Sequence, residues 1–251
     1  MELFKIFGRI ALKGQEETED GLDSVAGKAS GVGQALLKGI GTFAKWGAAA
    51  ATAAATATAA LVKSAVTAYS DYEQLVGGVE TLFKDSASEV QKYAANAYQT
   101  AGLSANEYME TVTGFSASLL QSLDGDTKAA AEKANVAITD MSDNANKMGT
   151  SMESIQNAYQ GFAKQNYTML DNLKLGYGGT KEEMQRLLED AEKLSGQKFD
   201  LSSYADIVDA IHVVQTEMGI TGTTAKEAAT TIQGSVNMTK AAWQNLVVGI
   251  A

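Results

Sequence analysis

The sequence predicts an all-α protein in which an extended Gly/Ala-rich N-terminal helical arm is followed by a compact multi-helix domain. Three observations favour this fold class. The 251 residues contain no proline, which is the residue that helix interiors tolerate least. Ten of residues 48–60 are alanine, the best helix former. Beyond residue 85, motifs that start helices alternate with glycines that end them.

The first 84 residues are predicted to hold two segments. Residues 1–14 carry apolar side chains on both sides of Gly8, a pattern typical of a short strand or an irregular edge. Residues 15–84 are the predicted arm. Spaced glycines between residues 21 and 47 weaken its first half, because each costs about 1 kcal/mol against alanine in a helix interior. Residues 48–72 instead favour one long helix.

An uncharged stretch of the arm, Trp46 to Val62, is a candidate membrane-contacting segment. Its seventeen residues lie at the short end of the range for a spanning helix, and its alanine-rich composition is only weakly apolar. The residues assigned to membrane contact are Trp46, Ala48, Leu61 and Val62. An Ala-rich soluble helix is the favoured alternative, since alanine has the highest helix propensity.

Residues 85–222 are predicted to form the compact domain, from six or seven short helices. Five Ser/Thr-x-x-Glu capping boxes predict helix starts: Ser86/Glu89, Ser104/Glu107, Thr150/Glu153, Thr180/Glu183 and Thr224/Glu227. Five glycines predict helix ends: Gly102, Gly125, Gly149, Gly196 and Gly219. Two further helices are expected to begin at Asp126 or Thr127 and at Ser203. Residues 223–251 are predicted to start a further long helix, interpreted as truncated.

Within these helices, apolar residues recur at spacings of three and four. The clearest stripes are Met184, Leu187, Leu188, Ala191 and Leu194, then Ile207, Val208, Ile211, Val214 and Met218, and also Met109, Val112, Phe115, Leu119, Leu120 and Leu123. Such stripes are the apolar faces of amphipathic helices, and each needs a partner. We therefore expect the helices to pack on one another around a common core.

Charge and cysteine content exclude several kinds of site. Without cysteine the chain has no disulfide, no thiolate zinc site and no cysteine nucleophile. Its net charge of −10 is uneven: residues 1–84 hold eight Lys/Arg and nine Asp/Glu, and residues 85–251 hold twelve and twenty-one. An acidic domain disfavours sequence-specific binding of nucleic acid. The aromatic residues that interleave with lysines are therefore expected to be core: Tyr159, Phe162, Tyr167 and Tyr177.

Three polar motifs were weighed as sites, and none is assigned a catalytic, metal or cofactor role. His212, the single histidine, is expected to be a satisfied or half-exposed helix residue, with a general base or metal ligand as the alternative. Residues 176–181 lack the spacing of a phosphate loop and are expected to be a flexible turn before the Thr180 cap. Asp140 and Asp143 lack the spacing of an EF-hand and are expected at helix ends or on solvated faces.

Five segments between residues 70 and 235 carry a resemblance to a known family. They are YEQLVGGVETLF at 72–83, AGLSANEYMETV at 101–112, AITDMSDNANKMGT at 137–150, SIQNAYQGFAKQNYTMLDNLKLGYGGTKEEMQRLL at 154–188 and TGTTAKEAATTIQGS at 221–235. These segments resemble the N-terminal region of bacteriophage and prophage tail tape measure proteins. The opening ELFKIFGRIAL, followed by a Gly/Ser/Lys/Ala arm, resembles the same proteins.

The resemblance implies a structural role without catalysis. Members of this family act as scaffold and ruler: tail tube subunits polymerise around them, and they leave the tail ahead of the DNA at infection. The implied partners are copies of the chain, tail tube subunits, tail assembly chaperones and, during ejection, the host membrane. The implied location is the lumen of the virion tail tube, with the host cytoplasm during assembly. The long helical middle that would measure length is missing, so the chain is interpreted as an N-terminal fragment or prophage remnant.

Two other classes of function remain as alternatives. A membrane-active helical protein would insert through residues 45–69, where charge is sparse. An enzyme would have to rely on His212 and on surface carboxylates, and no substrate follows from the sequence.

Overall fold

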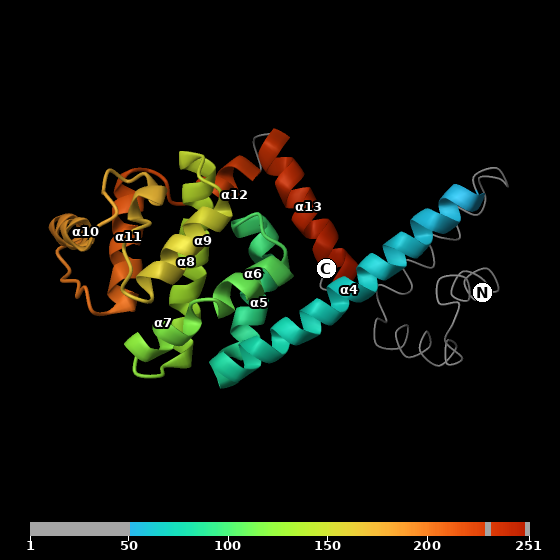
Figure 1. Ribbon diagram of the computed structural model, residues 1–251, viewed down its shortest axis with the longest axis horizontal. Helices are drawn as coiled ribbons and strands as arrows, with labels where there is room; N and C mark the ends of the chain where they lie inside the picture. Colours follow the sequence, from blue (N-terminus) through green and yellow to red (C-terminus); the bar gives the residue numbers. More distant parts are fainter. Residues whose placement is uncertain (1–50, 229–231, 249–251) are drawn as a thin grey trace. The chain divides into compact units, whose positions relative to one another are not determined.

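The computed structural model describes residues 51–228 and 232–248, and all regular structure in these residues is helical (Figure 1). The helices are α4 (Ala51–Phe83), α5 (Ala87–Thr100), α6 (Ala105–Thr113), α7 (Ser116–Ser122), α8 (Thr127–Met148), α9 (Met152–Phe162), α10 (Lys181–Ser195), α11 (Tyr204–Glu217), α12 (Thr223–Ala228) and α13 (Ile232–Val248), with the 3₁₀ helices η2 (Lys84–Ser86) and η3 (Leu170–Leu173). An all-α fold is thus confirmed for these residues. The predicted strand-like segment 1–14 and the first part of the predicted arm lie outside them.

The chain divides into two compact units. One contains residues 1–73 and 243–251, and the other contains residues 74–242. Helices α5 to α11, in the region predicted to be the compact domain, all belong to the second unit, as does α12. The candidate site described below lies entirely within this second unit.

Helix α8 is the central element of the second unit. It contacts α5, α6, α7, α9, α11 and α12, and Figure 1 shows it passing between them. Alanines at 130, 131, 134 and 137 are fully buried, and such small side chains let neighbouring helices approach closely. Because neighbours surround α8, four of its polar residues are buried as well as its apolar ones: Asp140, Ser142, Asp143 and Asn144.

Several helix starts follow the predicted capping motifs. Ser104 and Glu107 form the complete box, in which each side chain accepts a hydrogen bond from the other residue's backbone N–H. Asp126 and Ser203 cap α8 and α11 as expected. At Thr180 half of the box forms, because Glu183 turns away to accept from the Gly178 N–H.

At the other three predicted boxes a helix begins within two residues of the predicted start, but the box itself does not form. Ser86 makes no capping bond, and its Oγ lies 2.9 Å from the Thr127 Oγ1 instead, because η2 leads directly into α5. Helix α9 is capped by Ser151, one residue beyond the predicted Thr150, whose hydroxyl donates to the Asn172 carbonyl. At the predicted Thr224 start, α12 begins one residue earlier and takes its cap from another helix.

The five predicted helix-ending glycines all have positive φ angles, from 63° at Gly102 to 82° at Gly125. Gly149 and Gly196 are the left-handed C-cap residues of α8 and α10. Residues with side chains rarely adopt this conformation, so glycine lets the chain reverse there at little cost.

The predicted apolar stripes form the core, with exceptions at two helix ends. Leu194 is 48% exposed and Met218 is 45% exposed, although both were predicted to be buried. Both residues lie at the C-terminal ends of their helices, where the stripe runs past the neighbouring helix. Tyr159, Phe162 and Tyr167 are buried as predicted, and the Phe162 and Tyr167 rings stack with centroids 6.3 Å apart.

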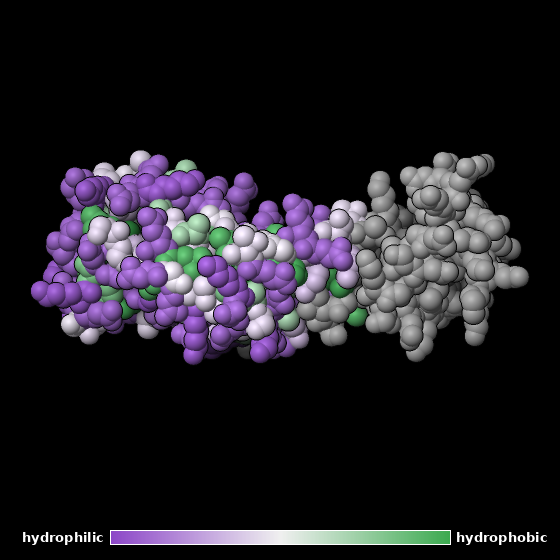
Figure 2. All heavy atoms as spheres, turned by 90° about the horizontal axis from the view of Figure 1, so that it is seen from below, coloured by the Kyte–Doolittle hydropathy of each residue, from purple (hydrophilic) through white to green (hydrophobic). Residues whose placement is uncertain are grey.

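The surface of the second unit is mainly polar. Figure 2 shows one face, on which hydrophilic side chains dominate the coloured part and apolar ones are scattered. The large apolar side chains exposed among the described residues are Met169, Leu194, Met218, Trp243 and Leu246. Met169, Leu194 and Met218 are single exposed residues of the second unit, which are ordinary on a folded protein. Trp243 and Leu246 lie three residues apart on α13 and belong to the other unit.

Candidate functional site

Two buried carboxylates lie one turn apart on α8. Asp140 is 1% exposed and Asp143 is fully buried. The prediction that they lie at helix ends or on a solvated face is therefore wrong. The reason is the central position of α8: α11 covers the side that carries Asp140, and α12 covers the side that carries Asp143. A buried carboxylate needs specific partners, and both residues have them.

Asp140 pairs with the single histidine. The His212 Nδ1 lies 2.8 Å from one carboxylate oxygen of Asp140 and 3.0 Å from the other, and 39% of the His212 side chain is exposed. The expectation of a satisfied, half-exposed histidine is confirmed. Burial raises the pKa of Asp140, although its bond to His212 acts in the opposite direction. The same bond raises the pKa of His212, with smaller contributions from Asp209 and Asp143. The imidazole therefore holds its proton more strongly than a free histidine.

A second ion pair joins the same two helices. The Lys133 Nζ donates to Asp209 at 2.6 Å, and both side chains are about a quarter exposed. Asp209 lies three residues before His212, so the two pairs lie on the same face of α11. The two ion pairs therefore join α8 to α11 at two positions along the helices.

Asp143 caps helix α12, about eighty residues further along the chain. One carboxylate oxygen accepts from the Gly222 N–H at 2.6 Å, and the other accepts from the Thr224 N–H at 2.7 Å. This carboxylate replaces the local Thr224/Glu227 box that the sequence predicts. A pattern search finds only caps that lie close in sequence, so it could not identify a cap supplied by α8.

The neighbouring polar residues of α8 bind two further segments, α5 and η3, and make additional bonds to α12. Ser142 donates to the Ala101 carbonyl at the end of α5 and lies 3.2 Å from the Thr224 hydroxyl. The Asn144 amide donates to the Leu173 carbonyl, and the Asn146 amide donates to Glu227. We call this set the α8 polar belt: Asp140, Ser142, Asp143, Asn144 and Asn146. The belt holds α5, η3, α11 and α12 around one helix.

The chemistry of the belt is that of a structural junction. A histidine oriented by a buried carboxylate is also one part of a general-base arrangement, which needs a nucleophile or a bound substrate beside it. A pocket of the second unit lies elsewhere, and His212 does not line it. Among the described residues, no group of three His, Asp or Glu side chains is placed to hold a metal ion.

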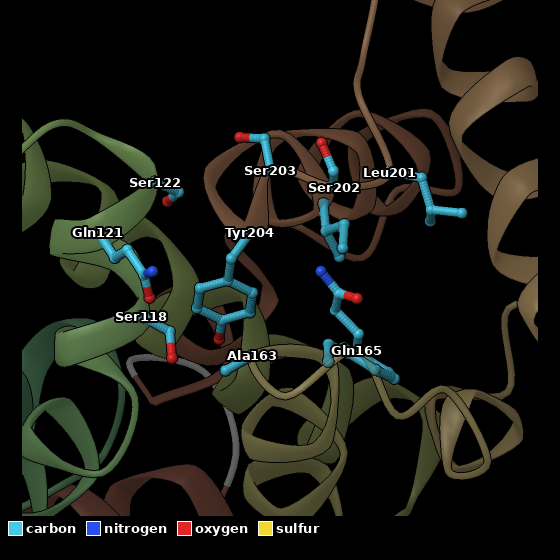
Figure 3. A pocket seen from close by; sticks show the side chains of 11 residues that line it. Ser118, Gln121, Ser122, Ala163, Gln165, Leu201, Ser202, Ser203 and Tyr204 are labelled. Atoms are coloured by element: carbon cyan, nitrogen blue, oxygen red, sulfur yellow. The ribbon is translucent and has the colours of Figure 1, made fainter.

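That pocket has a volume of about 360 Å³ and lies between α7, the turn after α9 and the start of α11 (Figure 3). Its lining is uncharged: Ser118, Gln121, Ser122, Phe162, Ala163, Gln165, Leu201, Ser202, Ser203, Tyr204 and Ile207. In Figure 3, Gln121 and Gln165 approach the Tyr204 ring from opposite sides. None of the residues predicted to form a site lines this pocket.

The turn at residues 176–181, predicted to precede the Thr180 cap, has several contacts with the helix that follows it. The Arg186 guanidinium lies 4.3 Å from the centre of the Tyr177 ring and donates to the Gly176 carbonyl at 2.8 Å. Glu183 accepts from the Gly178 N–H at 2.9 Å. The Tyr177 hydroxyl donates to Asp190, and burial together with this bond raises its pKa to about 12. Side chains of α10 thus fasten the turn that precedes them.

Only two of the four candidate membrane-contacting residues lie among the described residues. Trp46 and Ala48 lie outside the described residues, and Leu61 and Val62 lie within α4. In the part of the chain that is described, no helix has both the length and the apolar character needed to span a bilayer. Comparison with protein-family models, with curated proteins and with solved structures finds no match for this chain.

The Asp140–His212 pair should make stability depend on pH above about pH 6. The pKa of His212 is raised in the folded state, so its stabilising effect is complete below the unfolded value of 6.5 and is lost as the pH rises through the folded value. The carboxylates whose pKa is lowered, Glu183, Asp190 and Asp200, titrate in acid and do not contribute in this range. We expect the free energy of unfolding to fall as the pH rises from about 6 through the raised pKa of His212 in the folded protein.

Urea denaturation at several pH values, followed by circular dichroism, measures this dependence. His212→Gln, which cannot be protonated, should flatten the curve across that range. Equal slopes for the variant and the parent protein would show that another group is responsible.

Proposed function

We propose that this chain is a structural protein of a bacteriophage or prophage tail, corresponding to the N-terminal region of a tape measure protein. In this role it acts as a scaffold for tail tube assembly and for determining tail length, and it takes part in genome ejection. The observation that carries the proposal is the resemblance of five segments spread over residues 72–235.

The positions of these segments in the fold support a resemblance at the level of a whole domain. Segment 101–112 contains the complete capping box of α6, and segment 137–150 contains the α8 polar belt. Segment 154–188 covers α9, η3, the fastened turn and the start of α10. Segment 221–235 contains the amides that Asp143 binds. A resemblance carried by segments that contact each other in the fold is stronger evidence for a shared domain than a similarity of composition.

The same proposal includes the partners and the location. Copies of the chain, tail tube subunits and tail assembly chaperones are the proposed binding partners, with the host membrane as a partner during ejection. The protein would lie in the tail tube lumen of the virion and in the host cytoplasm during assembly. The excess of acidic residues beyond residue 84 disfavours a direct interface with DNA.

An in-frame deletion of residues 74–242 in the source phage or prophage tests the role in assembly. We expect induced lysates to contain capsids without tails, because tube polymerisation would lose its scaffold. Electron microscopy of the particles gives the fraction of capsids that carry tails. Expression of the intact chain from a plasmid should restore tails. Tails of normal number and length in the deletion strain would refute the proposal.

A further inference from the structure

We propose that α12 is a releasable latch, which Asp143 holds closed against α8. The latch consists of α12, and the turn before it, residues 219–222, is its hinge. Its two strongest contacts are the bonds from the Gly222 and Thr224 amides to the buried Asp143 carboxylate. This inference depends on these contacts alone and is independent of the proposed function.

The attachment of α12 is polar rather than apolar. None of its side chains at residues 223–227 is buried. Other bonds between α8 and α12 join Ser142 to Thr224, Asn146 to Glu227 and the Thr223 hydroxyl to the Asp143 carbonyl, and none of these three is made to a buried carboxylate. Hydrogen bonds to a buried charge are about twice as strong as neutral ones. Asp143 is therefore the principal anchor of the helix.

Helix α12 is also short, and its neighbours are α5 and α8. It has six residues, and isolated helices shorter than roughly twelve residues are marginal in water even with favourable sequences, so α12 depends on its contacts with these neighbours. A broken cap should therefore melt the helix as well as detach it.

The turn before α12 has the features of a hinge. Gly219 has a φ of 65° and Gly222 has a φ of 81°, and no atom lies within 4 Å of the position of an added Cβ at either residue. Between them, Ile220 is 1% exposed and anchors the hinge to the core. The chain can thus change direction after Ile220 while α5 to α11 keep their packing.

Hydrogen exchange followed by mass spectrometry tests the latch on the full chain. Asp143→Asn keeps the size of the side chain but removes its charge. It also replaces one of the two accepting oxygens with an NH₂ group, which cannot accept a hydrogen bond from a backbone N–H. We expect exchange of the amides at residues 222–228 to accelerate by about tenfold or more, since opening free energies set local exchange rates. Amides of α10 and α11 should exchange as in the parent protein.

Two further variants make the test specific. Asp209→Asn breaks the ion pair between Asp209 of α11 and Lys133, which lies on α8 like Asp143. It should leave amide exchange at residues 222–228 unchanged. Thr224→Val removes only the contact with Ser142, so it should accelerate amide exchange at residues 222–228 by less than Asp143→Asn does. This variant tests the latch even if Asp143→Asn does not fold. Uniform acceleration over all helices, or no change at residues 222–228, would overturn the proposal.

Discussion

Replacing His212 with alanine is expected to lower the free energy of unfolding by about 3 kcal/mol at pH 7. The variant leaves the Asp140 carboxylate 1% exposed and without its cationic partner. The carboxylate must then either remain charged in a poorly solvated position or take up a proton at neutral pH, and both are unfavourable. The expected loss is at the lower end for buried pairs, because the imidazole is 39% exposed and partly solvated.

A double-mutant cycle separates the pair from simple loss of side-chain packing. Asp140→Asn in the His212→Ala background should recover part of the lost stability, because a neutral amide replaces the unpaired charge. Lys133→Ala, which breaks the pair with Asp209 whose side chains are about a quarter exposed, is the matched control and should cost less than about 1 kcal/mol. Urea denaturation of the parent, the two single variants, the double variant and Lys133→Ala provides the free energies. If His212→Ala costs no more than Lys133→Ala, the Asp140 pair does not stabilise the fold.

The elements of this fold could be predicted from the sequence because their causes are local. The Ser104/Glu107 box and the left-handed glycines act within a few residues, and their positions agree with the structure. The apolar stripes were identified for the same reason, since a helix places residues at spacings of three and four on one face. Leu194 and Met218 were misassigned because a stripe does not reveal where the neighbouring helix ends.

The site could not be predicted, because its contacts join distant parts of the chain. Asp140 and His212 are 72 residues apart, and Asp143 is 79 residues from Gly222. Nothing in the local pattern distinguishes these carboxylates from exposed ones. One feature pointed toward them: five polar residues of the belt follow each other closely between Asp140 and Asn146, within a helix of 22 residues. Such a run in a long helix indicates either a solvated face or a set of buried partners, and only the three-dimensional packing decides between them.

Replacing Gly179 with alanine is expected to lower the free energy of unfolding by about 3 kcal/mol. An added Cβ would lie 2.3 Å from the Thr168 carbonyl oxygen and 2.9 Å from its carbon, so one backbone segment would have to move. Thr168 cannot shift freely, because its N–H and its hydroxyl both donate to the Asn166 side chain. On the other side, Glu183 and Arg186 fasten the turn to α10. The clash therefore lies between two segments that are each held in place.

The adjacent glycine is a matched control for this prediction. An added Cβ at Gly178 would meet only the flexible Glu183 side chain, at 3.5 Å, so Gly178→Ala should change stability by less than about 0.5 kcal/mol. Neither glycine has a positive φ, so the difference between the two variants measures steric contact rather than backbone strain. The urea midpoints of both variants give the two changes in the free energy of unfolding, provided that the m-values are equal. Similar values for the two variants would mean that the Gly179 segment and the Thr168 segment do not approach each other as closely as described.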